Sequence, residues 1–220
     1  VPPEIITAII GVETLYGART GGYRVLDALS TLGFHYPPRA NFFRSELSHF
    51  LLLTREEKMN PDEPTGSYAG AMGKPQFIPS SYRHYAIDFD KDGKRDIWNN
   101  NTDVIGSVAS YFSRHGWQKN QPVTVKAANV TSDHKAFIDA GMKPSLSVAR
   151  LRKSGIEVDK SISPEMTSSL VELKIDDGHE YWAGLHNFYV ITRYNHSNMY
   201  AMAVYQLSQE IKKTYNAGKK

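Results

Sequence analysis

A glutamate stands within the apolar stripe of the first helix that the sequence predicts. In IITAIIGVETLYG, residues 5–17, Ile6, Ile9 and Ile10 point to one side at about 100° per residue, and Glu13 falls between them. A carboxyl group among isoleucines is disfavoured as an anion, so its pKa should rise. A carboxylic acid that stays protonated near neutral pH can donate a proton to the leaving oxygen of a glycosidic bond. The alternative is structural: Glu13 pairs with a buried arginine or caps a backbone group.

A second segment, DFDKDGKRDIWNN at residues 88–100, carries oxygen ligands at alternate positions. Three aspartates followed by a glycine match the start of an EF-hand loop; they are Asp88, Asp90, Asp92 and Gly93. Lys94 would then supply a backbone carbonyl. The twelfth position is Asn99 instead of glutamate, so the closing carboxylate has to come from Asp96 or Asp103. The pattern predicts a bound hard cation, and the alternative is a solvated acidic turn.

A third segment, GSYAGAMGKPQFIPSSY at residues 66–82, is rich in glycine and is long for a connection inside a compact domain. Ser67 and Gln76 could form hydrogen bonds with a polar ligand. The segment lacks the Gly-Lys-Ser/Thr ending of a phosphate-binding loop. By itself it indicates a ligand-binding loop or a simple connection.

Composition excludes several classes of protein. The 220 residues carry a net charge of +3, which is too small to indicate a nucleic-acid partner. The absence of cysteine excludes disulfides, thiol catalysis and thiolate metal sites. No run approaches the roughly 18 apolar residues of a membrane-spanning helix. The 13 tyrosines are compatible with stacking surfaces for sugars, although tyrosines also fill cores.

The elements that must position these residues are mostly helical. Apolar spacing predicts helices over residues 5–17, 23–34, 40–58, 80–87 and 102–117. In the first of them, Thr7, Gly11 and Thr14 are expected on the polar side. Alternation predicts strands within 121–130, 170–176 and 180–185, with short helices at 133–140 and 147–153 between them. Helix returns from residue 186. We therefore expect a helical core over 1–117, a small mixed insert over 118–180 and a return to the helical core over 181–220.

The three chemical segments, in this order, resemble the lytic murein transglycosylase B family of bacterial cell-wall enzymes. The resemblance extends through IGSVASYFSRHGW and NFYVITRYNHSNMYAMAVYQL and so covers nearly the whole chain. It implies a mainly α (α+β) fold, with a lysozyme-like helical catalytic core and a small inserted mixed α/β domain. Family members usually carry a helical portion before the GVET helix, so the chain is expected to be a shortened form.

The resemblance also assigns roles to individual residues. Glu13, in the GVET motif, matches the catalytic acid and base. The residues that match the substrate groove are Ser67, Gln76, Tyr111, Tyr194, Asn195 and Tyr200. The calcium loop matches Asp88, Asp90, Asp92 and Lys94, with Asp103 as the closing carboxylate. Compared with the family, the loop carries one extra residue near its end, and Lys74 and Pro75 precede Gln76 where some relatives differ. Lys74 is a candidate contact for an anionic group of the substrate.

The implied reaction needs a single carboxylate. Most glycosidases use two, but no second acid has the apolar setting of Glu13; Glu46, Glu56, Glu57, Asp62 and Glu63 are all expected to be solvated. The resemblance implies non-hydrolytic cleavage of the MurNAc-β-1,4-GlcNAc bond to 1,6-anhydroMurNAc ends, with a structural Ca²⁺. The alternatives are a lysozyme-type muramidase that uses water and an inactive wall-binding fragment. A calcium sensor is less favoured, because such sensors pair two loops.

The resemblance also implies a setting. The expected partners are peptidoglycan glycan strands, with cell-wall synthesis and remodelling proteins as further candidates, and the expected state is a monomer. The expected location is the bacterial periplasm, and the parent protein could be an outer-membrane lipoprotein whose anchor lies outside this chain.

Overall fold

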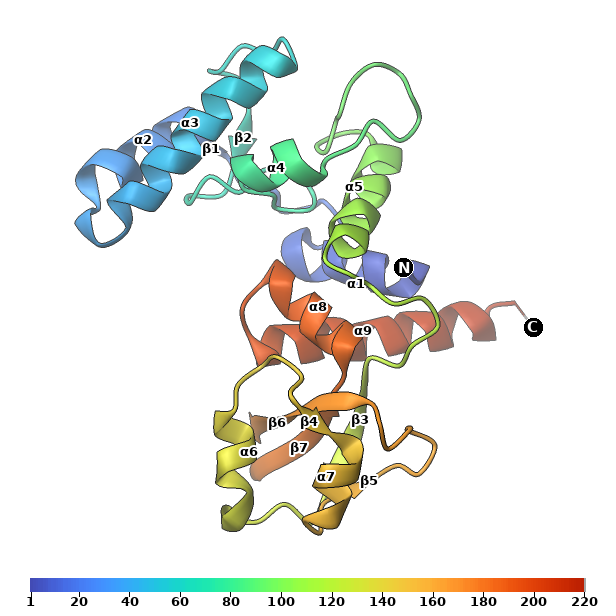
Figure 1. Ribbon diagram of the computed structural model, residues 1–220. Helices are drawn as coiled ribbons and strands as arrows, with labels where there is room; N and C mark the ends of the chain where they lie inside the picture. Colours follow the sequence, from blue (N-terminus) through green and yellow to red (C-terminus); the bar gives the residue numbers. More distant parts are fainter. Residues whose placement is uncertain (220) are drawn as a thin grey trace. The chain divides into compact units, whose positions relative to one another are not determined.

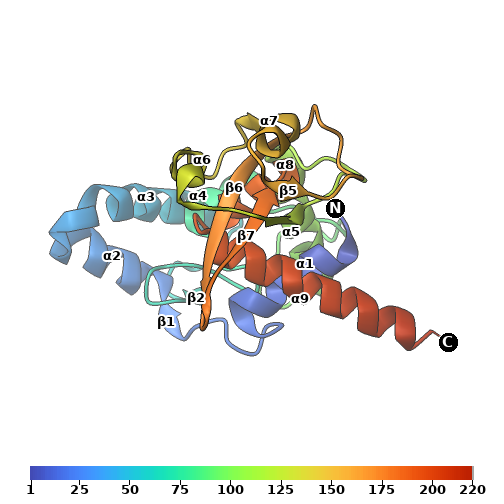
Figure 2. The same ribbon diagram turned by 90° about the horizontal axis from the view of Figure 1, so that it is seen from below.

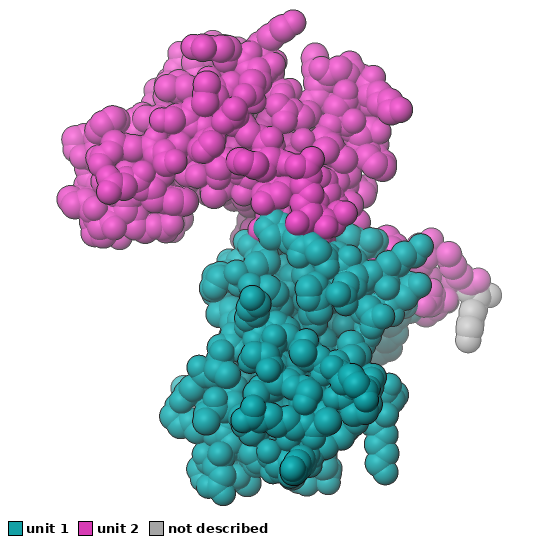
Figure 3. Space-filling view, in the orientation of Figure 1, with its two compact units in different colours: residues 1, 115–213 teal, residues 2–114, 214–220 magenta. Residues whose placement is uncertain are grey.

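The computed structural model describes residues 1–219. It is mainly helical, as predicted, and the larger of its two sheets has five antiparallel strands. The chain divides into two compact units (Figure 3). We call residues 2–114, together with the chain end from 214, the helical unit. Residue 1 and residues 115–213 form the sheet unit. The unit boundary lies between residues 114 and 115, and the predicted limits 1–117, 118–180 and 181–220 stay a prediction.

The helical unit contains five α-helices and two very short strands among the described residues. The helices are α1 (Pro3–Thr14), α2 (Val25–His35), α3 (Ala40–Glu56), α4 (Pro79–Tyr85) and α5 (Asn101–Arg114), with a 3-10 turn, η1 (Pro37–Arg39), before α3. Helices α2 and α3 lie side by side as a hairpin (Figures 1 and 2). Strands β1 (Tyr23–Arg24) and β2 (Thr65–Gly66) pair antiparallel. This pairing joins the segment after α1 to the glycine-rich loop.

Helix α1 ends at Thr14, three residues earlier than predicted, because the next three residues are all left-handed. Leu15, Tyr16 and Gly17 have φ angles of 48°, 59° and 94°. The amide of Leu15 donates to the carbonyl of Gly11, and the amide of Tyr16 donates to that of Ile10. These two bonds satisfy two of the last carbonyl groups of the helix.

The prediction that Gly11 and Thr14 lie on the polar side of α1 is wrong. Both residues are buried. The Tyr16 ring folds back over Gly11, and a Cβ atom there would lie 2.8 Å from that ring. The side chain of Thr14 points into the unit and is 1% exposed, and its hydroxyl is bonded there to backbone groups. Thr7 is exposed, as predicted.

The prediction that Glu46 is solvated is also wrong. Glu46 lies on the buried side of α3 with Phe43 and Phe50, and it is 4% exposed. Its Oε2 atom accepts a hydrogen bond of 2.9 Å from the amide of Ser80, in the first turn of α4. A carboxylate near a helix N-terminus is favoured by the exposed amides and by the helix dipole. Glu46 therefore fastens α4 to α3.

The sheet unit is built on five antiparallel strands in the order β4-β6-β7-β3-β5. The strands are β3 (Thr124–Ala128), β4 (Leu146–Ser147), β5 (Glu157–Val158), β6 (Thr167–Ile175) and β7 (Gly178–Gly184). Strands β6 and β7 form a long hairpin in which Ile175 pairs with Gly178. Glycine is required at 178, where φ is 126°.

Short helices complete the sheet unit. A 3-10 turn, η2 (Ser132–His134), leads into α6 (Lys135–Asp139), and α7 (Val148–Lys153) follows β4. Both α6 and α7 lie over the sheet (Figure 2). The core includes Val148, Leu151 and Leu170. Helices α8 (His186–Tyr194) and α9 (Asn198–Ala217) follow the last strand, where the sequence predicts a return to helix. None of the described helices is both long enough and apolar enough to span a bilayer.

The carboxylate of Glu46 predicts a graded response to substitution. Glu46→Ala leaves the Ser80 amide without its acceptor, so the free energy of unfolding should fall by about 2–3 kcal/mol. Glu46→Gln keeps an acceptor oxygen and should lose less than about 1 kcal/mol. Urea denaturation measures both values. Equal losses in the two variants would contradict the role of Glu46 as an acceptor for α4.

Candidate active site and cation-binding loop

Glu13 lies on the last turn of α1 and is half-buried. Of the three isoleucines that precede it on the helix, Ile9 is fully buried, Ile6 is 6% exposed and Ile10 is half-buried. The apolar stripe exists as predicted, and Glu13 lies at its end, where the helix gives way to left-handed backbone. This position combines an apolar flank with access to solvent. The catalytic assignment of Glu13 stays a prediction at this point.

The residue after Glu13 fixes the end of the helix. The Thr14 hydroxyl donates to the carbonyl oxygen of Lys74 at 2.9 Å and to that of Ile10 at 3.2 Å. The same hydroxyl oxygen accepts from the amide of Gly17 at 3.1 Å. Since Thr14 is almost fully buried, each of these bonds replaces water that the hydroxyl cannot reach. The turn after Glu13 is therefore held by the glycine-rich loop.

The glycine-rich loop is an ordered structure instead of a simple connection. Met72 and Phe77 exchange backbone hydrogen bonds, which closes a tight turn over residues 73–76. Gly73 has a φ of 64°, and a Cβ atom there would lie 2.5 Å from the carbonyl oxygen of Ile97, so glycine is required. Gln76 adopts a φ of 53°, which costs free energy for a residue with a side chain. Its surroundings must offset that cost.

The two predicted polar residues of this loop are both bonded to backbone. The Gln76 amide nitrogen donates to the carbonyls of Thr20 and Gly73, at 3.1 and 2.9 Å. The Ser67 hydroxyl oxygen accepts from the amides of Ala69 and Ala71. These contacts leave the amide oxygen of Gln76 as an acceptor and the hydroxyl hydrogen of Ser67 as a donor for a ligand.

Tyr111, on α5, lies in an aromatic cluster and is 7% exposed. Its ring is 4.7 Å from that of Tyr85 and 5.8 Å from that of Phe77, between ring centroids. The remaining predicted groove residues lie in the sheet unit. Tyr194 ends α8, Asn195 is exposed after it, and Tyr200 lies in the first turn of α9, where its amide donates to Ser197.

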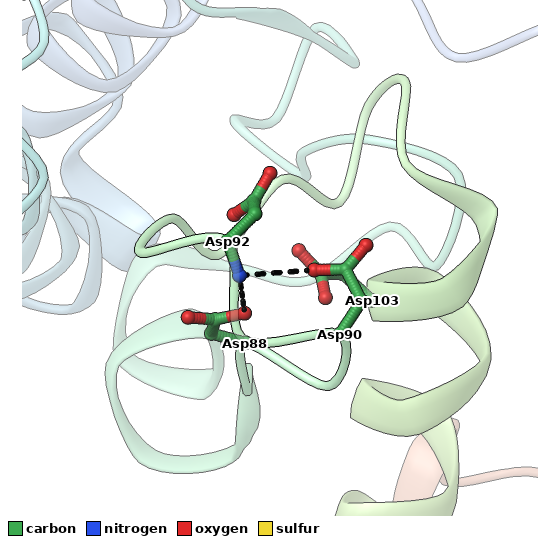
Figure 4. A group of neighbouring side chains, drawn as sticks. All are labelled: Asp88, Asp90, Asp92 and Asp103. Atoms are coloured by element: carbon green, nitrogen blue, oxygen red, sulfur yellow. Dashed lines mark hydrogen bonds between the residues drawn. The ribbon is translucent and has the colours of Figure 1, made fainter.

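Four predicted cation ligands come together. The carboxylates of Asp88, Asp90 and Asp92 come from the loop and that of Asp103 from α5, and one oxygen of each lies within 4.8 Å of the others (Figure 4). The sequence left Asp96 and Asp103 as alternatives for the closing ligand. Among the described residues, the cluster contains Asp103 and not Asp96.

The cluster is held by backbone amides. Asp103 is fully buried, and its two oxygens accept from the amides of Phe89 and Asp96, at 2.7 and 2.9 Å. Asp88 accepts from the amides of Asp92 and Gly93. Carboxylate oxygens keep further lone pairs, and four of them converging match the all-oxygen coordination that Ca²⁺ prefers. The residues present therefore fit a hard divalent cation.

Two ion pairs connect the aspartate loop and α4 to the C-terminal end of α3. Arg95, inside the loop, donates to Glu57 at the end of α3, and Arg83 on α4 donates to Glu56. The hydrogen bonds and charge of Arg83 lower the pKa of the Glu56 carboxyl. Tyr82 is buried and donates to the carbonyl of Arg95 at 2.6 Å, and its burial raises the pKa of its phenol.

A cavity of about 640 Å³ opens in the helical unit beside this loop. Its lining includes Gly17, Lys74, Thr65 and Trp98, and it does not include Glu13. The indole nitrogen of Trp98 donates to the carbonyl of Thr65 at 3.0 Å, which joins the loop to β2. The cavity is thus lined by the turn after α1, the glycine-rich loop and the aspartate loop.

Sequence reasoning missed two residues that shape the site. Thr14 looked polar and exposed, and no local signal indicates that its partner is a carbonyl 60 residues away. Asn100, at the end of the aspartate loop, is the second such residue, and the family resemblance assigns it no role. Its side chain donates to Asp90 at 2.7 Å and accepts from the amide of Thr102 in the first turn of α5. An asparagine before a helix is a recognisable N-cap signal, so this second role could have been found.

Comparison with known proteins gives concordant matches. The family profile of the transglycosylase SLT domain matches residues 1–209. The membrane-bound lytic murein transglycosylase B of Escherichia coli K12 is 48% identical over 211 residues, 96% of this chain. This chain spans 57% of the length of that relative.

Solved structures of lytic transglycosylases also match nearly the whole chain. The soluble lytic transglycosylase SltB1 from Pseudomonas aeruginosa is 54% identical with a TM-score of 0.92, covering 98% of this chain and 72% of SltB1. Escherichia coli Slt35, in complex with calcium, is 46% identical with a TM-score of 0.87, covering 97% and 67%. Pseudomonas aeruginosa SltB3, in complex with NAG-anhNAM-pentapeptide, is 31% identical with a TM-score of 0.84, covering 96% and 57%.

The two bonds of the Gln76 amide nitrogen predict a strong effect of a nearly isosteric change. Gln76→Glu would point carboxylate oxygens at two carbonyl oxygens, so the free energy of unfolding at pH 7 should fall by about 2–3 kcal/mol. Gln206→Glu, at an exposed position on α9, is the matched control and should change stability by less than about 0.5 kcal/mol. If both variants denature at the same urea concentration, the assigned orientation of Gln76 is wrong.

Proposed function

The chain belongs to the transglycosylase SLT domain family, and from this premise we propose that it is a peptidoglycan lytic transglycosylase in which Glu13 is the single catalytic acid and base. The observation that carries the proposal is the position of Glu13 on the last turn of α1, where the Thr14 hydroxyl fixes the turn to the glycine-rich loop. The helix that presents the acid and the loop that offers Ser67 and Gln76 are thereby held in one unit.

The proposed reaction uses one carboxyl group twice. Glu13 first donates its proton to the oxygen between N-acetylmuramic acid and N-acetylglucosamine, and that bond breaks to leave an oxocarbenium-like carbon. The Glu13 carboxylate then takes the proton of the muramyl C6 hydroxyl, whose oxygen bonds to the same carbon and closes a 1,6-anhydro ring. No water is consumed, and Glu13 ends protonated as it began. A site that excludes water favours this outcome over hydrolysis.

The carboxylates of α3 and of its C-cap residue support a single-acid mechanism. Glu46 binds the Ser80 amide, Glu56 binds Arg83 and Glu57 binds Arg95. Each of these groups already stabilises the fold as an acceptor. A second carboxylate acting on the substrate, as most hydrolytic glycosidases require, would have to leave one of these contacts or come from another segment.

The proposed glycan contacts come from both units. In the helical unit, the Ser67 hydroxyl and the Gln76 amide oxygen would bind polar groups of the sugars, and Tyr111 would form an aromatic wall. In the sheet unit, Tyr194, Asn195 and Tyr200 are further proposed contacts for the glycan. The complex of the relative SltB3 with NAG-anhNAM-pentapeptide supports a peptidoglycan substrate.

The proposed cation is Ca²⁺, held by Asp88, Asp90, Asp92 and Asp103 with the backbone carbonyl of Lys94. The complex of the relative Slt35 with calcium supports this choice. A bound Ca²⁺ would supply positive charge that neutralises the clustered carboxylates and holds the loop closed. Its role is structural, so this chain's own residues carry the reaction.

The proposed setting is the bacterial periplasm, where peptidoglycan glycan strands are the substrate and proteins of cell-wall synthesis and remodelling are candidate partners. The membrane-bound relative supports a location at the cell envelope. We propose that the chain acts as a monomer.

The assignment of Glu13 predicts a specific loss. Glu13→Gln keeps the shape of the side chain but cannot donate or accept the proton, so release of anhydromuropeptides from purified sacculi should fall by at least about 100-fold. Glu63→Gln, an exposed glutamate of the same unit, is the matched control and should keep wild-type turnover. Comparable turnover by Glu13→Gln would sink the assignment.

The aspartate cluster predicts a dependence of stability on calcium. At a free Ca²⁺ concentration about 100 times its Kd, binding adds about 2.7 kcal/mol, so chelation should lower the Tm by about 5–10 °C and added calcium should restore it. Asp92→Asn should lose most of this difference, whereas Asp133→Asn, at an exposed position outside the cluster, should keep it. An unchanged melting curve in excess chelator would count against a bound ion.

A further inference from the structure

Lys74 contacts three separate segments of the helical unit through three different groups. Its carbonyl oxygen accepts from the Thr14 hydroxyl at 2.9 Å, at the end of α1. Its amide donates to the carbonyl of Ile97 at 2.9 Å, in the aspartate loop. Its ammonium group donates to the side-chain oxygen of Asn101 at 2.6 Å, in the first turn of α5. One residue thus joins the catalytic helix, the cation-binding loop and the helix that supplies Asp103.

The first of these contacts bears directly on Glu13. Three left-handed residues follow the helix, and the Thr14 hydroxyl ties that turn together by accepting from the Gly17 amide while it donates to Lys74. The aliphatic part of the Lys74 side chain packs so closely on Gly17 that a Cβ atom at 17 would lie 2.8 Å from it. A shift of Lys74 would therefore move both the backbone partner of Thr14 and the surface on which Gly17 rests.

The other two contacts connect Lys74 to the aspartate cluster. Ile97 follows Asp96, whose amide is held by the buried Asp103 carboxylate at 2.9 Å. Asn101 follows Asn100, whose side chain donates to Asp90 at 2.7 Å. Both partners of Lys74 are thus adjacent in sequence to residues bonded within the cluster. A movement of the loop on cation binding would therefore be transmitted to Lys74 through its bonds to Ile97 and Asn101.

We propose that Lys74 is a positioning residue, which couples occupancy of the aspartate loop by a divalent cation to the placement of Glu13. This inference rests on the proposed function for its catalytic consequence, because Lys74 acts through Thr14 and not on the substrate. Coupling between two sites is reciprocal. A cation that orders the loop holds the Lys74 amide and ammonium group, and through the Lys74 carbonyl it holds the turn after Glu13.

The test uses the whole chain and a readout that does not depend on activity. Hydrogen exchange at the Gly17 amide is measured with and without Ca²⁺, because this amide donates to both the hydroxyl and the carbonyl of Thr14, each at 3.1 Å. In the wild type, calcium should slow this exchange by about three- to tenfold. In Lys74→Met, which keeps the packing on Gly17 and the backbone bond to Ile97 but loses the bond to Asn101, calcium should slow this exchange less than about half as much as in the wild type. Lys119→Met, at an exposed position in the sheet unit, is the matched control and should behave as the wild type.

Two further variants distinguish coupling through the Lys74–Asn101 bond from a general loss of stability. Asn101→Ala removes the same bond from its other end at an exposed position and should reproduce the effect of Lys74→Met, with no added loss in the double variant. Lys74→Arg keeps a donor for Asn101 and should restore the response to calcium. In turnover of glycan strands, Lys74→Met should lower kcat about three- to tenfold and leave KM within about twofold.

Two results would overturn the coupling. One is a calcium response at Gly17 in Lys74→Met equal to that of the wild type. The other is a loss of thermal stability in Lys74→Met with kcat unchanged, which would make Lys74 merely structural. If the wild type releases no product at all, the proposed function fails instead, and the exchange measurement still decides whether the loop and the helix end are linked.

Discussion

The hydrogen bond from the Thr14 hydroxyl to the Lys74 carbonyl is the interaction on which the arrangement of the helical unit depends. Helix α1 stops one residue after Glu13, and the next three residues adopt left-handed backbone that two of them, Leu15 and Tyr16, rarely take. A turn of this kind persists when surrounding contacts specify it. The bond to Lys74 specifies it from outside the helix, so the position of Glu13 is set by a loop 60 residues away.

The same unit keeps its charged groups satisfied at every buried position that we identify among the described residues. Asp103 is fully buried, and backbone amides on both sides of the loop hold its oxygens. Glu46 is buried and holds the first turn of α4. A buried carboxylate without such partners would be strongly destabilising. Glu13, in contrast, combines an apolar flank with partial access to solvent.

Helix and strand positions could be predicted well because apolar spacing records which face of each element is buried. The stripe of α1, the alternation of Val171 to Lys174 in β6 and the aspartate spacing at 88–92 all correspond to observed features, whereas burial in β7 increases along the strand and does not alternate. The failures at Thr14 and Glu46 share one physical cause. Each is a polar residue buried because it bonds a backbone group of a distant segment, and such a partner leaves no trace in local periodicity. The roles of Ser67, Gln76, Tyr111, Tyr194, Asn195 and Tyr200 came from family resemblance and stay predictions.

In the proposed reaction, the muramyl C6 hydroxyl, and not water, replaces the leaving sugar. Digestion of purified sacculi by this chain in water enriched in oxygen-18, followed by mass spectrometry of the released muropeptides, tests it most directly. The released muropeptides should be lighter than hydrolytic products by one water and should carry no oxygen-18. Muramic acid ends that contain oxygen-18 would contradict it and would identify a hydrolase.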